Sequence, residues 1–213
     1  MHRIKAALIP VLVFFLSFSI SSVRASYIYS FEIFTTNGIY YDSTELDTYV
    51  VVSDGSGEVN FTFYNESLIT SSIAGIYFDN GSLLGISSIT EGPGTAFTQP
   101  DPPGELPNGN DLVPPFETTN EFCIEGDPPP SHNGVNPVDE GQPLEWVTVT
   151  FDLINGGTLE GVIDELNSGM LRIGIHITAL PDGSSESAIA VPEPTSLLLF
   201  GLGLLTLIFK RKS

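Results

Sequence analysis

The stretch Leu171-Arg172-Ile173-Gly174-Ile175-His176-Ile177-Thr178 alternates a large aliphatic side chain with a small or polar one. Successive side chains of a β-strand point to opposite sides, so this period of two is typical of a strand with one buried face. We expect the aliphatic residues to lie in a core and Arg172 and His176 to share the other face. Such a strand belongs in an antiparallel sheet that is covered on one side.

More segments with strand character precede this one along the chain. Alternating or β-branched patterns predict strands at 27–35, 49–53, 59–64, 73–78, 83–89 and 146–153. Turn-forming pairs, among them Asn37-Gly38 and Asn80-Gly81, separate several of these segments. The sequence therefore predicts an all-β fold, a single antiparallel β-sandwich of the jelly-roll type.

One short helix interrupts the strands before residue 171. Its apolar residues follow the spacing i, i+3, i+4, i+7 and are Leu159, Val162, Ile163 and Leu166. Thr158 is suited to cap the start of this helix, and Gly169 is placed to end it. We expect the helix to dock its apolar side on the sheet.

A proline-rich stretch, residues 91–143, separates two groups of strands and contains 12 of the 16 prolines. This density of proline predicts that the stretch is not central sheet. It is either an ordered excursion over the sandwich or a flexible polyproline-like connector. We favour the excursion because Phe97, Leu106 and Phe116 provide apolar anchors.

The charges divide the chain into three parts. Between Ser26 and Val191 lie 25 of the 26 acidic residues and one of the seven basic residues, Arg172, for a net charge near −24. Such a surface favours solubility and opposes binding to nucleic acid and to acidic polymers. It also suggests the hypothesis that the domain binds divalent cations, with solubility alone as the alternative.

The first 25 residues have the three parts of a secretory signal peptide. A basic start is followed by an apolar stretch, and Val23-Arg24-Ala25 resembles a signal peptidase site. We predict cleavage between Ala25 and Ser26 by signal peptidase, with an uncleaved membrane anchor as the alternative. The exported domain is then residues 26–190.

Residues 191–213 form a second targeting signal. The motif Pro192-Glu193-Pro194 precedes an apolar transmembrane helix predicted at 195–209, and a membrane stop made of Lys210, Arg211 and Lys212 follows. At about 1.5 Å per residue, this helix is just long enough to cross a membrane. Because clustered cations stay on the cytoplasmic side, the proline motif is expected outside.

This tail resembles the PEP-CTERM sorting signal of Gram-negative bacteria. The resemblance implies recognition by an exosortase, a membrane cysteine protease, and a carrier that is exported and linked with exopolysaccharide or biofilm. It covers about the last 23 residues, so it implies a route and not an activity. The alternative is a plain membrane anchor. Residues 159–177 also resemble uncharacterised exported members.

Motifs that would mark an enzyme are absent from the sequence between the two signals. It has no Gly-x-Ser-x-Gly, P-loop or His-Glu-x-x-His motif. His132 and His176 are expected to be surface residues. Cys123, the sole cysteine, is expected to be buried, with an exposed thiol as the alternative.

Carboxylates are too numerous for any one pair to stand out as catalytic. The pairs considered are Asp164 with Glu165 and Asp139 with Glu140, together with the group Asp42, Glu45 and Asp47. We expect no cofactor, although Ca²⁺ is possible at two turns, Asp79-Asn80-Gly81 and Asn108-Gly109-Asn110-Asp111. A turn without a metal is the simpler interpretation of both.

Three functions remain open for the central domain. The first, which we favour, is a non-enzymatic protein of the cell surface or extracellular matrix, exported across the inner membrane and anchored there transiently by its C-terminal helix. The second is a carbohydrate-binding module that uses exposed aromatic residues, with Tyr40, Tyr41, Tyr64 and Trp146 as candidates. The third is a secreted hydrolase with two carboxylates. For Trp146, at the start of an alternating strand, we expect a position in the core.

Overall fold

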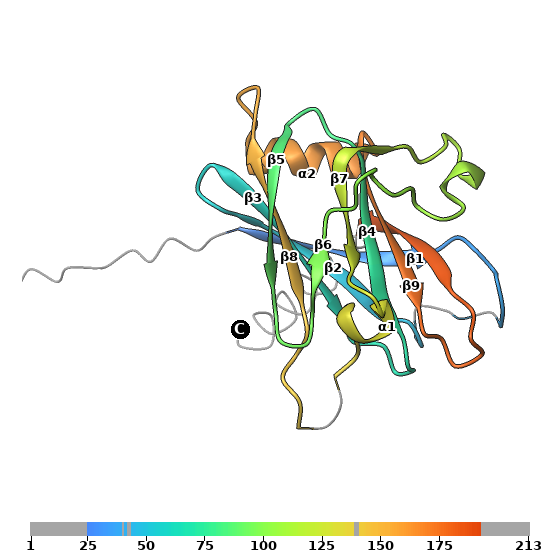
Figure 1. Cartoon of the computed structure of the whole chain (residues 1–213). Coiled ribbons are helices and arrows are strands. Elements are labelled where there is room, and N and C mark those ends of the chain that lie inside the picture. Colours follow the sequence, from blue (N-terminus) through green and yellow to red (C-terminus); the bar gives the residue numbers. More distant parts are fainter. Residues whose placement is uncertain (1–24, 40, 42–43, 139–140, 193–213) are drawn as a thin grey trace, which may run out of the picture.

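The computed structural model describes residues 25–39, 41, 44–138 and 141–192, and its main element is one antiparallel sheet (Figure 1). The strand order is β5-β8-β3-β2-β1-β10-β9-β4-β7-β6. The strands are β1 (Ser26–Ile33), β2 (Thr48–Asp54), β3 (Glu58–Asn65), β4 (Ser72–Asn80), β5 (Leu84–Glu91), β6 (Phe97–Thr98), β7 (Thr118–Gly126), β8 (Val147–Leu153), β9 (Leu171–Thr178) and β10 (Glu186–Pro192). The helices are α1 (Pro130–Asn133), α2 (Leu159–Ser168) and the short 3₁₀ helix η1 (Gly109–Asp111).

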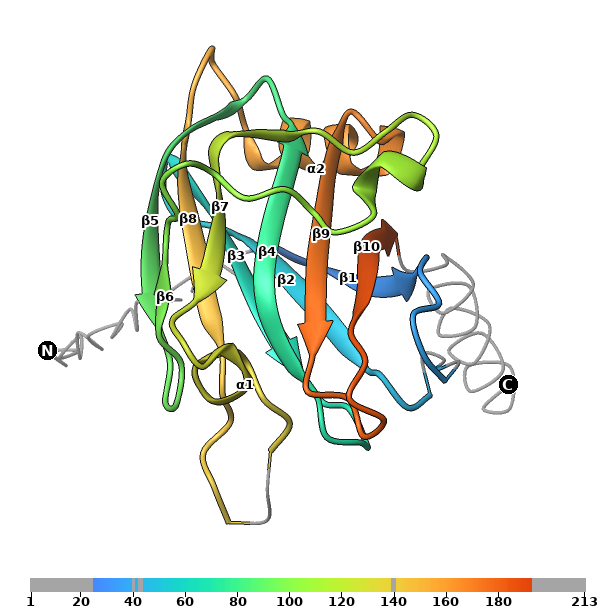
Figure 2. The same ribbon diagram turned by 45° about the vertical axis from the view of Figure 1, so that its right-hand side comes forward.

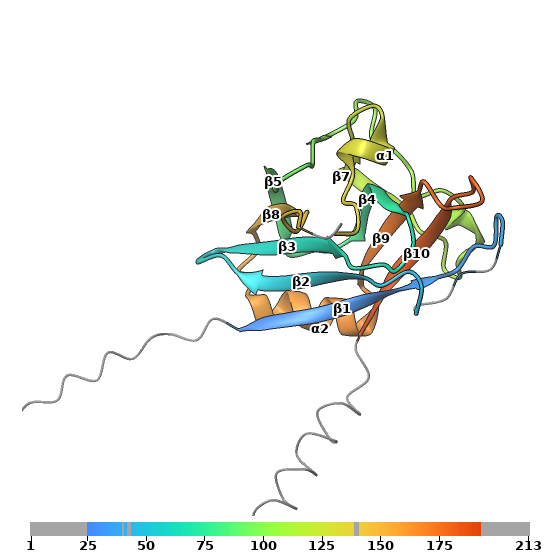
Figure 3. The same ribbon diagram turned by 90° about the horizontal axis from the view of Figure 1, so that it is seen from below.

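The sheet curls over so that its two halves pack against each other, as Figure 3 shows from below. Phe61 of β3 meets Phe78 of β4 edge to face, with ring centroids 5.2 Å apart. Phe122 of β7 meets Phe151 of β8 at 4.9 Å in the same manner. The all-β prediction is confirmed, and the two layers of the expected sandwich are halves of one sheet that is continuous through β1 and β10.

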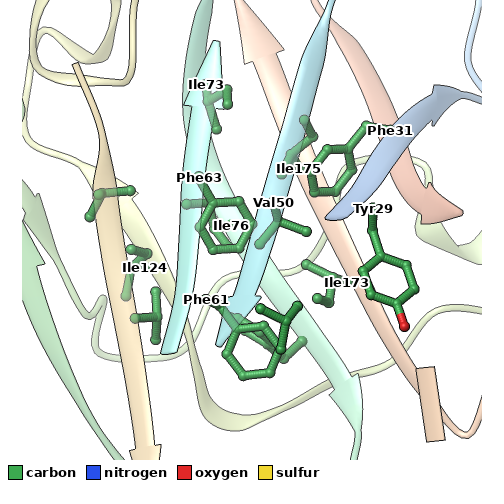
Figure 4. Packing of buried hydrophobic residues seen from close by; sticks show 14 of the residues in the cluster. Tyr29, Phe31, Val50, Phe61, Phe63, Ile73, Ile76, Ile124, Ile173 and Ile175 are labelled. Atoms are coloured by element: carbon green, nitrogen blue, oxygen red, sulfur yellow. The ribbon is translucent and has the colours of Figure 1, made fainter. Parts of the chain in front are cut away.

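The core lies between these halves and is built from the inward residues of nearly every strand (Figure 4). Val50, Phe63, Ile73 and Ile175 are fully buried and come from β2, β3, β4 and β9. The aliphatic residues of β9 are all buried, and Arg172 and His176 lie on its other face, as the alternation predicts. Burial of aromatic and aliphatic surface is therefore the main stabilising contribution to this fold.

Helix α2 covers one end of the curled sheet, at the top of Figures 1 and 2. The Thr158 side chain accepts a hydrogen bond from the Gly161 backbone N–H at 3.1 Å, which satisfies one of the free donors at the helix start. Gly169 ends the helix with a φ of 74°. The apolar side of α2 is buried in the core, as the sequence predicts.

The proline-rich stretch contains two strands, β6 and β7, which the sequence prediction missed. Strand β7 pairs with β4 on one side and with β6 on the other, so the exclusion of this stretch from the sheet interior was wrong. The physical reason is local, since no proline lies between Thr118 and Gly126. The prolines gather on either side of β7.

Residues 99–117, here called the covering segment, cross the outer face of β7, β4 and β9 (Figure 2). Leu106 and Phe116 of this segment are buried with Tyr77 and Cys123 in a second, smaller apolar cluster. Gly174 makes room for this contact, because a Cβ atom there would lie 2.6 Å from Leu106. The covering segment is thus an ordered excursion over the sheet.

Arg172 holds the covering segment to the sheet. Its guanidinium forms an ion pair with Asp79 of β4 and donates hydrogen bonds to the carbonyl oxygens of Pro114 and Pro115. It also lies over the Phe116 ring, 5.3 Å from the ring centroid. Arg172 is the only Lys or Arg between Ser26 and Val191. It links its own strand β9 to the neighbouring strand β4 and to the covering segment.

Strand β10, also missed by the prediction, runs through the interior of the sheet between β1 and β9. Its last residue, Pro192, pairs with Tyr29 of β1, so the sheet includes the first residue of the Pro192-Glu193-Pro194 motif. Because β1 and β10 are antiparallel, Ser26 and Pro192 lie at the same end of this strand pair. The described part of the sheet therefore ends at the first residue of this proline motif.

Several predicted features fall outside the residues that the structure describes. They are the signal peptide up to Arg24, Glu193 and Pro194, the helix at 195–209 and the basic residues Lys210, Arg211 and Lys212. Within residues 25–39, 41, 44–138 and 141–192, no helix has the length and apolar character needed to cross a membrane.

Candidate functional site

One half of the sheet keeps an uncovered outer face. The covering segment lies over β7, β4 and β9, whereas the outward residues of β1, β2, β3, β8 and β5 are half-buried or exposed. Cross-strand pairing arranges these outward residues in rows that run across the strands. One of the rows is aromatic.

The aromatic row consists of Tyr49, Tyr64 and Trp146. Tyr49 of β2 and Tyr64 of β3 are direct cross-strand partners, and their rings stack with centroids 5.2 Å apart. Trp146 stands one position beyond the last registered pair of β3 and β8, Phe63 with Val147, and therefore continues the row. All three side chains are half-buried.

The Trp146 indole lies flat on the backbone of Gly92. A Cβ atom built on Gly92 would fall 2.8 Å from both Cδ2 and Cε2, the two atoms shared by the rings of the indole. Only glycine leaves room for a ring in this position. The expectation that Trp146 belongs to the core was wrong, because Val147 takes the inward position and turns Trp146 to the outside.

Tyr49 is held in place by its hydroxyl group. The hydroxyl donates a hydrogen bond to Oε1 of Glu66 at 2.7 Å. Burial of the ring and this carboxylate raise the pKa of Tyr49, which keeps the phenol protonated and able to donate. The ring therefore has a fixed orientation in the row.

Rows of hydroxyl and amide groups adjoin the aromatic row on the same face. Thr62 and Thr148 pair through their hydroxyls at 2.8 Å, and the Thr150 hydroxyl donates to Oδ1 of Asn60 at 2.7 Å. Ser88 and Thr90 extend these rows onto β5 and are exposed. The polar rows are thus uncharged up to Glu58 and Asp152 at their far end, and the carboxylate beside the aromatic rings is that of Glu66.

A cleft of about 660 Å³ is lined by residues that follow β3 and precede β8. The connection after β3 and the segment before β8 form its walls, with Ser67, Leu68, His132, Val138, Gln142 and Glu145 among the lining residues. Ser67 is 7% exposed, and its hydroxyl has no hydrogen-bond partner among the described residues. The cleft and the row adjoin in sequence, since Glu66 precedes Ser67 and Glu145 precedes Trp146.

The structure separates the four aromatic candidates of the carbohydrate-binding hypothesis. Tyr64 and Trp146 stand in the aromatic row, Tyr41 is buried with 7% exposure, and Tyr40 lies outside the described residues. Tyr49 was not among the candidates. The sequence did indicate that Tyr49 faces outward, because the alternation of 49–53 places Val50 and Val52 inward.

Cys123 is buried, as predicted, and is 1% exposed. Burial raises the pKa of its thiol, and the sulfur accepts a hydrogen bond from the Gly104 backbone N–H at 3.3 Å. His132 is exposed in α1 and bonded through Nδ1 to the Ser131 hydroxyl. His176 is half-buried on β9. In these contacts the Cys123 thiol is bonded to the Gly104 backbone and His132 to Ser131. Neither histidine is therefore seen to act on the thiol among the described hydrogen bonds.

The pH dependence of stability should report on His176. Burial lowers the pKa of His176 below its usual value of 6.5, and the nearby Glu125 carboxylate only partly offsets this. The unfolded chain therefore binds a proton at a pH where the folded chain does not, so the contribution of His176 to stability is constant above about pH 7 and falls as the pH drops through about 6.5. Denaturant unfolding between about pH 7.5 and 5.5 should show this fall for the wild type.

The matched pair of variants is His176→Gln and His132→Gln. The first should flatten the dependence over this interval, and the second, at an exposed position, should leave it as in the wild type. A His176→Gln variant with the full wild-type dependence would contradict the assignment.

The carboxylate candidates do not form a shared site among the described residues. Glu165 is buried and accepts a hydrogen bond from the Ser82 hydroxyl at 2.6 Å, whereas Asp164 is exposed. Glu45 is half-buried and Asp47 exposed, while Asp42, Asp139 and Glu140 lie outside the described part of the chain.

The two turns considered for Ca²⁺ differ in their surroundings. Asp79 forms the ion pair with Arg172, so its carboxylate already has a cationic partner. In the second turn, Asn108 and Asp111 contact each other across η1 at 3.5 Å. Over the part of the chain that the structure describes, no three His, Cys, Asp or Glu side chains gather as a group that could hold a metal ion.

Comparison with known proteins identifies the C-terminal segment. Residues 190–212 match the PEP-CTERM protein-sorting motif, a stretch that begins inside β10 and extends through Lys212. No curated protein and no solved structure matches the chain. The match defines an exported protein with a membrane-associated sorting signal of the type that an exosortase recognises. The chain is a PEP-CTERM-containing protein whose folded part is the acidic, curled β-sheet domain.

Proposed function

We propose that this protein is a non-catalytic component of the cell surface or extracellular matrix, delivered by signal peptidase and exosortase processing and retained among extracellular polysaccharide. The observation that carries the proposal is the sorting motif at 190–212, which begins inside the last strand of the folded domain. The predicted signal peptide at the other end of the chain supports the same route.

The position of the motif suits processing after the domain has folded. Pro192 is exposed at the end of β10 and paired with Tyr29. Proline fixes its own φ and keeps the preceding residue extended, so the strand ends at Val191 and Pro192 in an extended form that a protease can bind.

The surface of the domain supports a place in a hydrated matrix. With a net charge near −24 between Ser26 and Val191, the domain repels other copies of itself and acidic lipids. The aromatic row and the polar rows beside it provide a surface for a polysaccharide partner. These features favour a binding component over the third candidate, a carboxylate-based hydrolase.

Cell fractionation with intact-mass measurement tests the processing step. The wild type should lose the segment that ends in Lys210-Arg211-Lys212-Ser213 and reach the outside of the cell. A variant with Pro192, Glu193 and Pro194 replaced by alanine should keep the segment and stay in the inner membrane. Pro181→Ala, an exposed proline in the loop after β9, is the matched control and should behave as the wild type.

Retention of the tail in the wild type would contradict the proposal. If wild type and the triple variant both remain in the membrane with residues 210–213 intact, the motif is not processed in this protein. The chain is then an anchored domain, and the proposed release into the matrix is refuted.

A further inference from the structure

We propose that the aromatic row on the outer face of β2, β3 and β8 is a binding platform for a neutral polysaccharide, on which Tyr49, Tyr64 and Trp146 stack against successive pyranose rings. This inference deepens the proposed function, because it names the surface and the chemical class of the partner.

The shape of the platform follows from the sheet. Adjacent strands lie about 4.8 Å apart, so three side chains in one row across three strands span roughly 10 Å. That length allows contact with more than one ring of an extended sugar chain. The C–H groups on the face of a pyranose pack favourably on the negative face of an aromatic ring.

Trp146 provides the best stacking surface in the row. Its indole packs against Gly92, and the side chain is only half-buried, so part of the ring is open to solvent. The Tyr49 and Tyr64 rings are nearly parallel, with an angle of 25° between their planes, and Glu66 fixes Tyr49. A ligand therefore meets rings that are already ordered, which reduces the entropy cost of binding.

The neighbouring rows supply hydrogen bonds to sugar hydroxyls. Each hydroxyl has one donor and two acceptor sites, so the bonded pair Thr62 and Thr148 retains capacity for a ligand. Asn60 and Thr150 form the next row, further from the aromatic rings, and their side chains also retain hydrogen-bonding capacity for a ligand. A surface that combines flat rings with hydroxyl and amide groups is suited to a polyhydroxylated chain.

Charge decides between neutral and acidic polysaccharides. The aromatic row and the two polar rows carry no cation, and the domain as a whole is near −24. An acidic polymer would be repelled without forming any compensating ion pair. The partner is therefore a neutral glycan.

Trp146 is the sole tryptophan of the chain, so its fluorescence reports directly on the platform. The full-length protein in a mild detergent should show a shift or quenching of this emission when hydroxyethyl cellulose, laminarin or galactomannan is added, and none with alginate. Affinity electrophoresis in gels that contain the same four polymers gives an independent measurement of binding.

The variants separate this platform from other surfaces. Trp146→Ala and Tyr64→Ala should each weaken the binding by about tenfold, while Trp146→Phe should retain most of it. Met170→Ala is the matched control, since Met170 is an apolar residue that is 57% exposed and stands between α2 and β9, outside the aromatic and polar rows. Thermal unfolding of each variant checks that the fold is kept.

Three results would overturn the inference: no response to any of the three neutral polymers, binding to alginate alone, or undiminished binding by Trp146→Ala and Tyr64→Ala. Because these assays use purified protein, they do not depend on where the protein is delivered in the cell. Failure of the processing experiment and failure of this platform are therefore distinguishable.

Discussion

Replacing Phe78 with alanine should lower the free energy of unfolding by about 4 kcal/mol. Phe78 is fully buried and meets Phe61, Phe63 and Phe151 edge to face, with ring centroids 5.2, 6.3 and 4.9 Å away. It projects from β4 in one half of the sheet into contact with β3 and β8 of the other. Removing the ring leaves a cavity at the seam between the two halves.

Denaturant unfolding at neutral pH measures this effect. Leu68→Ala is the control, because Leu68 is 84% exposed and its loss should change stability by less than about 0.5 kcal/mol. A Phe78→Ala variant that loses less than about 1 kcal/mol would mean that the halves do not pack through this aromatic group.

The second large effect concerns the covering segment. Arg172→Met should destabilise the domain by about 3 kcal/mol, because the Asp79 carboxylate, 8% exposed, then loses its cation in a mostly buried place. The carbonyls of Pro114 and Pro115 lose their donors at the same time. Besides the change in stability, Cys123 should react faster with a thiol reagent, since the covering segment shields it.

A double variant tests the cause of this loss. Replacing both members of the ion pair with apolar residues, in Asp79→Leu with Arg172→Met, removes the uncompensated charge and should recover part of the stability. If the double variant is as unstable as the sum of the single changes, the cation and the carboxylate do not stabilise each other.

The strands that could be predicted from the sequence are those with a clear alternation. Strands β1 to β5, β8 and β9 and helix α2 carry their own pattern, and Thr158 and Gly169 mark the ends of the helix. Strand β10 has the sequence ESAIAVP, whose small residues give only a weak alternation, and it adjoins a motif that the prediction assigned to a tail. Its place in the sheet depends on pairing with β1, which lies far away in sequence.

The curl of the sheet could not be predicted for the same reason. The curl depends on the pairing of strands that are distant in sequence and on contacts between them, such as that of Phe61 with Phe78. A local sequence pattern indicates neither the pairing nor the contacts. The aromatic row has the same origin. Each of Tyr49, Tyr64 and Trp146 has an outward position by alternation, but their alignment depends on the register of β2, β3 and β8.

The site of β10 in the sheet also determines how the domain responds to mechanical load. A pull on the chain beyond Pro192, along the strand axis, shears the β1–β10 ladder, in which Ala188 to Pro192 pair with Ile33 to Tyr29. Shear loads the hydrogen bonds of a ladder together, whereas peeling at an edge breaks them one after another. A domain held by its C-terminus while its outer face is bound elsewhere would therefore resist force as a unit.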